Sequence, residues 1–287
     1  MSKSSNSSHY DGAPLPQRKT NPGPKVLKEV RQHRSFPALR AIGALILREV
    51  QTSHARTSGG YLWAIAEPVG GILMLTLIFQ AFLKAPPIGI DFSLFYATGV
   101  IPFMGYMDIS GKVASSITYS KGLLQYPAVT FADAIIARII FGAITQVMVA
   151  LFVFTGILML FDTRADPQID LVASSLIMSI SLASAIGSLN CFMNAAFGWW
   201  HSIWSILMKP MFLLSGIFFI YDDVPQPFRD YLWWNPLIHA VGQMRRAFYP
   251  SYVGDYVSVS YVLGLSLLLF AIGFALLVRF HRDLQYS

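Results

Sequence analysis

The chain has 287 residues, of which 54% are hydrophobic and only 13% are charged, with a formal net charge of +6. Soluble domains carry roughly 25% charged residues. Here the charges gather in the first sixty residues and between long apolar stretches, which excludes an ordinary soluble domain. No nucleic-acid-binding motif accompanies the positive charge, so we expect no nucleic acid as a partner. The single cysteine, Cys191, excludes an intramolecular disulfide, and no spacing of ligand residues indicates a metal site.

The first segment, residues 1–36, is rich in Ser, Pro, Gly, Lys and Arg. Such a composition cannot bury enough apolar surface to form a core, so it predicts a disordered cytosolic tail. The composition changes at Pro37. We therefore expect one transmembrane domain over residues 37–287.

A periodic segment begins directly after this tail. Its apolar residues share one face of a helix: Leu39, Ile42, Leu45, Ile46 and Val50. Arg40 and Arg48 fall on the opposite face. This pattern predicts an N-terminal amphipathic helix that lies at the membrane interface. The alternative is a helix that packs against protein.

Six later segments are long and apolar enough to cross a membrane, which requires roughly 20 residues in a helix. These segments cover residues 62–83, 94–117, 135–161, 171–197, 203–220 and 257–280. The fold class that follows is an all-α polytopic membrane protein with six transmembrane helices.

Few charged residues lie in these segments. Glu67, directly before Pro68, lies near the start of the first span, and both a capping or pairing role and a place on a substrate path remain open for it. Asp108 and Lys112 are four residues apart on the second span, so we expect them to form an ion pair with a mainly structural role.

The lysines and arginines predict the orientation. With six spans, 16 of the 21 lie at the termini and in the second and fourth loops, or next to them. Positive residues favour the cytosolic side, so both termini are expected there.

The segment between the fifth and sixth spans, residues 221–256, is too polar to span but contains two apolar groups, separated by Asn235-Pro236. Proline biases the preceding residue away from the helix. We predict two short re-entrant helices on the outer side. The alternative is an ordinary external loop with a hydrophobic lid.

No catalytic machinery is visible. The nearest approach to a phosphate-binding loop, Gly105 to Lys112, has the wrong glycine spacing, and Val113 replaces the required hydroxyl. No Ser–His–Asp or paired-carboxylate arrangement can be inferred from the spacing. We expect a chain without enzymatic activity and without a cofactor, in which case any ATP must be hydrolysed by another subunit.

All six tryptophans fall near the predicted membrane boundaries: Trp63, Trp199, Trp200, Trp204, Trp233 and Trp234. Amphipathic rings prefer the headgroup region, so an aromatic belt explains them. Stacking on sugar rings is the functional alternative.

Two blocks of sequence carry a family resemblance. Residues 47–52 read LREVQT and residues 56–68 read RTSGGYLWAIAEP. Further on, residues 215–219 read SGIFF and residues 234–240 read WNPLIHA, followed by a pair of arginines. The chain from Pro37 onwards resembles the permeases of polysaccharide-export ABC transporters, most of all the capsular polysaccharide group. It departs slightly at residues 57–59, where a Ser-x-Leu-like run is common in the family.

The resemblance implies a complex of two copies of this chain and two ATP-binding subunits, with ATP and Mg²⁺ bound by those subunits. It implies a cytosolic helix that docks on the ATPase, and the docking candidates are Lys121, Gly122, Leu123, Leu124, Gln125, Tyr126, Pro127, Arg48 and Arg56. Substrate would pass between the two copies. The candidates for this path are Tyr61, Trp63, Glu67, Trp200, Trp233, Trp234, Arg245 and Arg246.

The function that follows is export of a polysaccharide, capsular and with or without a lipid anchor, across the bacterial inner membrane. Periplasmic or outer-membrane proteins would continue the path, which we expect to be wet, aromatic-lined and lightly basic. The alternatives are an ABC permease for O-antigen, teichoic acid or another lipid or drug, and a secondary transporter. Deep ionisable groups in several spans would favour the secondary transporter, and they are absent from the sequence.

Overall fold

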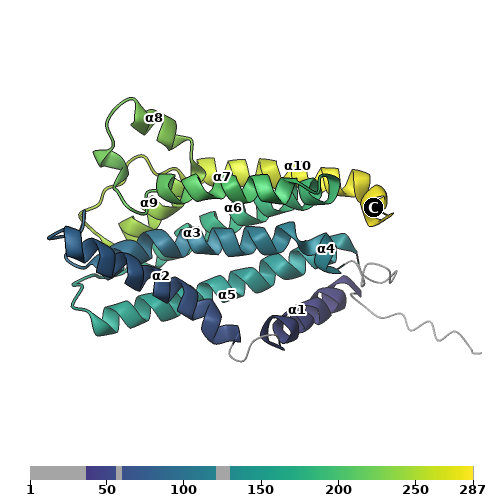
Figure 1. The fold of residues 1–287 in the computed structure, drawn as a ribbon, viewed down its shortest axis with the longest axis horizontal. Helices are drawn as coiled ribbons and strands as arrows, with labels where there is room; N and C mark the ends of the chain where they lie inside the picture. The colour runs from purple at the N-terminus through teal and green to yellow at the C-terminus, as the bar shows by residue number, and fades with distance from the viewer. Residues whose placement is uncertain (1–36, 56–59, 121–129, 287) are drawn as a thin grey trace, which may run out of the picture. The chain divides into compact units, whose positions relative to one another are not determined.

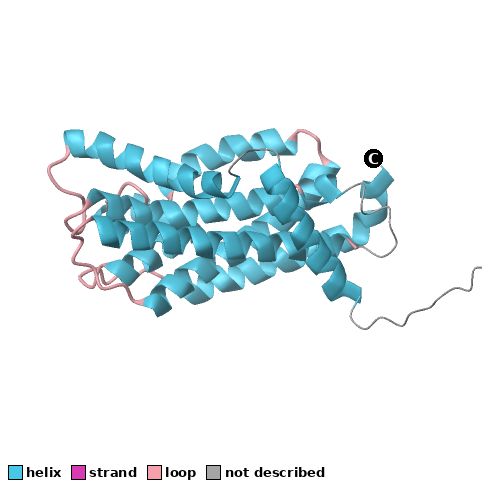
Figure 2. Cartoon of the chain, turned by 90° about the horizontal axis from the view of Figure 1, so that it is seen from below, coloured by secondary structure: helices cyan, strands magenta, loops and turns pink. Residues whose placement is uncertain are grey.

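The computed structural model describes residues 37–55, 60–120 and 130–286. Within these ranges the chain forms helices and loops and no strand (Figures 1 and 2). The helices are α1 (Pro37–Ala55), α2 (Gly60–Phe82), α3 (Phe92–Ala114), α4 (Ser116–Ser120), α5 (Phe131–Leu160), α6 (Ile169–Ala196), α7 (Trp200–Leu214), the 3-10 turn η1 (Tyr221–Asp223), α8 (Phe228–Trp233), α9 (Pro236–Phe248) and α10 (Val259–Tyr286). The predicted tail, Arg56 and residues 121–127 lie outside the described residues.

Four of the described helices are long and apolar enough to cross a membrane: Leu62–Phe82 of α2, α5, α6 and Val259–Phe280 of α10. Helix α3 is long, but its polar residues lower its hydropathy. Helix α7 has only 15 residues. The all-α fold is thus confirmed, and the structure supports four of the six predicted spans by length and composition.

The fifth predicted span, residues 203–220, ends early. Helix α7 stops at Leu214, and Gly216 follows with a φ of 76°. Glycine adopts this left-handed conformation without the steric cost that a Cβ imposes. The chain therefore turns at Gly216 instead of continuing the helix. The apolar run through Ile220 gave no signal of this break.

Helix α6 forms the centre of the bundle, where it packs against α3, α9 and α10. Small residues permit this close approach. A Cβ at Gly187 would lie 2.7 Å from Val113 Cβ, and a Cβ at Gly273 would lie 2.7 Å from the backbone nitrogen of Leu189. Close contact between small residues is a common basis of helix association in membranes.

Helix α1 packs by one face on α5. Leu45 is buried against Ala134 and Ala137, with Ile42 and Ile46 beside it. The predicted amphipathic helix is confirmed, and part of its apolar face contacts protein, as in the alternative expectation. A position at the membrane interface stays a prediction.

The two short helices predicted after α7 are also confirmed, as α8 and α9. Asn235 separates them: its side chain accepts a hydrogen bond from the Leu237 backbone N–H at 3.1 Å and donates one to the Leu214 carbonyl at 3.0 Å. Pro236 begins α9, where its missing N–H costs no helical hydrogen bond. The depth of this pair in a membrane stays a prediction.

Candidate functional site

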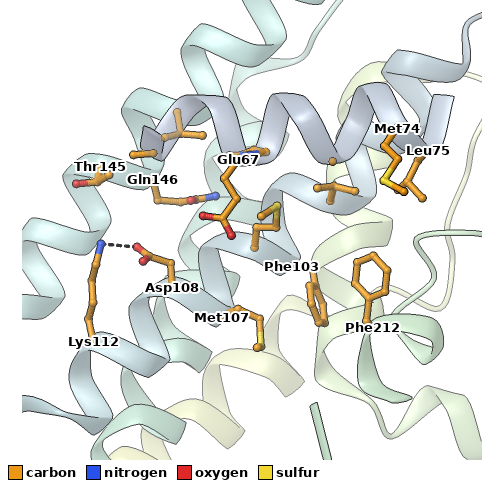
Figure 3. A pocket seen from close by; sticks show the side chains of 16 residues that line it. Glu67, Met74, Leu75, Phe103, Met107, Asp108, Lys112, Thr145, Gln146 and Phe212 are labelled. Carbon is orange, nitrogen blue, oxygen red and sulfur yellow. Dashed lines mark hydrogen bonds and ion pairs between the residues drawn. The ribbon is translucent and has the colours of Figure 1, made fainter. Parts of the chain in front are cut away.

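A cavity of about 690 Å³ lies among α2, α3, α5 and α7 (Figure 3). Its volume is in the range of roughly 300–1,000 Å³ that is typical of small-molecule sites. Residues of four helices line it: Ala64, Glu67, Pro68, Gly71, Met74 and Leu75 of α2; Val100, Phe103, Met104, Met107, Asp108 and Lys112 of α3; Thr145, Gln146 and Val149 of α5; and Phe212 of α7.

One end of this cavity is charged. Lys112 Nζ donates to Asp108 Oδ2 at 2.6 Å, which confirms the predicted pair. Figure 3 shows the Glu67 carboxylate on the same side of the cavity, and no hydrogen bond or ion pair joins it to any other described residue. Two carboxylates and one ammonium group line this end, so acidic groups outnumber basic ones in the cavity.

The other end is apolar and aromatic. The rings of Phe103 and Phe212 lie edge to face with centroids 5.2 Å apart, and Phe212 meets Phe218 in the same way at 5.3 Å. Met74, Met104 and Met107 line the same cavity. Methionine side chains are flexible and polarisable, so they can adapt to ligands of different shape.

A second cluster lies near the beginning of α5, before the turns of that helix that line the cavity. The Arg138 guanidinium lies 3.5 Å from Glu49 Oε1 of α1, donates to the Lys112 carbonyl, and donates to Ser115 Oγ at 2.8 Å. Tyr119 of α4 lies under this guanidinium, with 4.3 Å between Cζ and the ring centroid. One side chain thus joins α1, the end of α3, α4 and α5.

The comparison with known proteins decides the family. Residues 40–249 match the family model of the ABC-2 type transporter. The chain belongs to the ABC-2 type transporter family. It is 33% identical to the polysialic acid transport protein KpsM of Escherichia coli over 238 residues, which is 82% of this chain and 91% of that protein.

Two further relatives align with this ABC-2 chain over a similar length. The capsule polysaccharide export inner-membrane protein CtrC of Neisseria meningitidis is 28% identical over 249 residues, which cover 86% of this chain and 93% of the relative. The capsule polysaccharide export inner-membrane protein BexB of Haemophilus influenzae is 23% identical over 248 residues, with the same coverage. The family resemblance found in the sequence is thereby confirmed.

Three further candidates for the substrate path, Trp63, Glu67 and Trp200, lie apart from one another. Glu67 lines the cavity, whereas Trp63 is exposed on α2 outside its lining. Trp200 donates its Nε1–H to Asn190 Oδ1 at 2.9 Å and stacks on Trp204, so it joins α6 to α7. The side chain of Tyr61 is outside the described part of the chain.

The sequence analysis missed most of the cavity lining. Val100, Phe103, Met104, Met107 and Asp108 follow the three- and four-residue spacing of one helical face, and this spacing could have grouped them. The contacts of this face with α2, α5 and α7 are tertiary, so no local pattern indicates them.

Trp233 and Trp234, two candidates for the substrate path, lie together. Their rings meet edge to face with centroids 5.4 Å apart. Trp233 is partly buried and donates its Nε1–H to the Tyr256 carbonyl at 3.2 Å, whereas Trp234 is 68% exposed. Of the two rings, only that of Trp234 is therefore mostly exposed to the surroundings. Burial raises the pKa of the neighbouring Tyr256, which keeps its hydroxyl protonated.

Arg245, another candidate for the substrate path, is buried. Its side chain is 1% exposed, and it donates to the Phe219 carbonyl at 2.6 Å and the Ile217 carbonyl at 3.1 Å. The guanidinium also lies 4.4 Å from the centroid of the Phe95 ring. Arg245 thus holds the turn after α7, and it is not open to substrate in this conformation. Arg246 is half-buried and donates to Gln243 Oε1 at 3.3 Å.

Of the docking candidates, Arg48 lies within the described part of the chain. Arg48 of α1 lies 5.1 Å from the Tyr119 ring centroid, next to the Arg138 cluster. Arg56 and residues 121–127 are outside the described ranges, and α4 ends at Ser120, directly before them. The Arg138 cluster therefore adjoins the segment for which docking is predicted.

Proposed function

We propose that this ABC-2 chain is the membrane-spanning subunit of an ATP-driven exporter that carries a capsular polysaccharide across the bacterial inner membrane. The observation that carries this proposal is the similarity to three export proteins over 82–86% of the chain. The absence of a phosphate-binding loop from the sequence supports a division of labour in which separate subunits bind ATP and Mg²⁺.

We further propose six spans, with α3 and α7 added to the four helices that are apolar enough by themselves. Helix α3 packs against α5 and α6, and Figure 1 shows the three helices side by side. A helix between two spanning helices lies within the membrane too, and its polar residues are then shielded by protein. Both termini would face the cytosol, with α8 and α9 entering the outer leaflet.

A second copy of the chain would pack against α2 and α7. Both helices expose large apolar side chains, among them Leu62, Met74 and Leu77 on α2 and Ile206 and Leu213 on α7. The cavity lies behind these helices, so pairing of two copies would place two cavities along one path. The aromatic end of each cavity would offer a moving polymer several weak contacts instead of one tight binding site.

Coupling to the ATPase would pass through the Arg138 cluster. Docking of residues 121–127 would move α4, which ends directly before them and carries Tyr119 next to Arg48. Arg138 touches α4 through Tyr119 and α1 through Glu49, so this movement would reach both helices and α5.

A second candidate is an ABC-2 exporter of a lipid or lipid-linked glycan. The methionines and phenylalanines of the cavity favour it, because they suit an apolar chain better than a sugar. In this case α2 and α7 would form the same interface, and only the cargo would differ.

The direct test is deletion of this chain from its own bacterium, followed by measurement of polysaccharide inside cells and on their surface. We expect polysaccharide to accumulate inside, and re-expression of the chain to restore it to the surface. Unchanged surface polysaccharide together with an altered lipid composition would favour the second candidate. Unchanged polysaccharide and lipid would contradict both.

A further inference from the structure

A second hollow of the molecule lies between α5 and α6, on the side of their connecting loop. It has a volume of about 370 Å³ and is lined almost entirely by carbon. Its floor is buried and consists of Ala150, Phe154, Leu176 and Phe248. Phe154 and Phe248 stack with centroids 4.4 Å apart, so α9 closes the hollow from behind.

Two parallel ridges form the rim of this hollow. Each ridge has exposed residues four positions apart, Val147, Leu151 and Thr155 on α5 and Ile169, Ala173 and Ile177 on α6. We call the hollow with these ridges the α5–α6 groove. Both walls belong to helices that are long and apolar enough to cross a membrane, so in a membrane their exposed ridges would face lipid.

The length of the groove matches one leaflet. It runs from Val147 to Leu158 on α5 and from Ile169 to Ile180 on α6. At 1.5 Å per helical residue, each wall is about 16 Å long. That is roughly half of the 30 Å hydrocarbon core, which is the depth that one acyl chain occupies.

The end of the groove nearest the loop is polar and carries both signs of charge. A recess of about 430 Å³ shares Leu158 with the groove and is lined by Asp162, Thr163 and Arg164. Arg164 has a φ of 49°, which is uncommon for a residue with a Cβ. Asp166 follows in the same loop, so the loop offers one guanidinium and two carboxylates to a headgroup.

We propose that the α5–α6 groove binds one phospholipid with an amine-bearing headgroup, such as phosphatidylethanolamine. One acyl chain lies in the groove, the phosphate pairs with Arg164, and the ammonium group pairs with Asp162. An apolar groove gains little over bulk lipid by holding a chain, because lipid tails are as apolar as leucine. The headgroup contacts therefore provide the preference. A purely anionic lipid would meet the two carboxylates without an amine to neutralise them.

The proposal requires that α5 and α6 cross the membrane, and it does not depend on what the exporter carries. Its test uses the full-length chain in phosphatidylcholine vesicles doped with phosphatidylethanolamine that carries a diazirine in one acyl chain. Phosphatidylglycerol with the same labelled chain is the second probe. After illumination, the labelled peptides are identified by mass spectrometry.

We expect labelling concentrated on α5 and α6, stronger with phosphatidylethanolamine than with phosphatidylglycerol. Ala173→Trp fills the groove and should reduce this labelling to the level of α10. Ala271→Trp on α10, which is equally exposed to lipid, should leave it unchanged. Asp162→Asn should reduce the preference between the two lipids, because the ammonium group loses its carboxylate. Asp223→Asn, an exposed change in η1, should retain the preference.

Even labelling of all spans would overturn the proposal, as would equal labelling of α5 and α6 in the wild-type chain and Ala173→Trp. A preference for phosphatidylglycerol would overturn the headgroup assignment. Size-exclusion chromatography and thermal unfolding of each variant establish that it is folded. Export by Ala173→Trp, measured separately, reports on the proposed function and not on lipid binding.

Discussion

Arg138 Nη2 lies 3.5 Å from Glu49 Oε1, and the two side chains are only 6% and 13% exposed. The pair joins α1 to α5, far apart in the sequence. Because Arg138 also donates to the Lys112 carbonyl and Ser115 Oγ, its charge is compensated in a largely buried position. The Arg138 side chain therefore connects α1 and the end of α3 through α5.

Replacement of this arginine tests the cluster. We expect Arg138→Gln to destabilise the chain by about 3 kcal/mol, because it breaks a buried ion pair between α5 and α1. Arg138→Lys should keep part of the stability, since one ammonium group cannot reach all the partners of a guanidinium. Thermal unfolding of the purified chain measures both. Arg40→Gln, an exposed change on α1, is the control, and an equally large loss there would refute the assignment.

A bulky side chain in the cavity among α2, α3, α5 and α7 tests whether exported cargo passes through it. Gly71 lines the cavity and Gly70 does not, and a Cβ at either position meets no atom within 4 Å. We expect Gly71→Trp to block export because its indole ring enters the cavity, and Gly70→Trp to export normally. Surface polysaccharide measures this difference. If both variants export at the wild-type rate, cargo does not use the cavity.

The burial of Arg245 in α9 predicts that its replacement lowers the stability of the chain. Arg245→Gln removes the donors to the Ile217 and Phe219 carbonyls, and unpaired buried polar groups cost about 1–3 kcal/mol each. The neighbouring variant Arg246→Gln should change stability by less than about 0.5 kcal/mol. Thermal unfolding distinguishes the two. Similar melting temperatures for both variants would show that the turn does not depend on Arg245.

Trp233 and Trp234 differ in exposure, so the more exposed ring can be tested by itself. Trp234→Leu should lower the export rate by about two- to tenfold, which corresponds to the roughly 0.5–1.5 kcal/mol of one aromatic contact. Its melting temperature should not change, because the ring is 68% exposed. Trp199→Leu, an exposed tryptophan at the other end of the bundle, should export normally. Equal effects of both changes would support the aromatic belt instead of sugar stacking.

Local sequence patterns predicted what depends on local structure. The apolar runs located α2, α5, α6 and α10, and Asn235-Pro236 located the break between α8 and α9, because proline and hydropathy act within a few residues. The Asp108–Lys112 pair follows from helical spacing alone.

Contacts between residues far apart in the sequence could not be predicted from local patterns. The positive charge of Arg245 indicated a surface position, but carbonyls 26 and 28 residues earlier satisfy it in the interior. The Arg138–Glu49 pair joins two helices with α2 and α3 between them in the chain, so no spacing rule reveals it. The approach of Glu67 to Asp108 at one cavity likewise depends on how α2 packs on α3.

The most direct test of the account is transport into inverted inner-membrane vesicles that contain this chain, with and without its ATP-binding subunit. Labelled polysaccharide is added outside together with ATP, and the amount enclosed is measured. We predict uptake that requires both subunits and ATP. Uptake by vesicles that contain this chain alone, or ATP hydrolysis by the purified chain alone, would contradict the account.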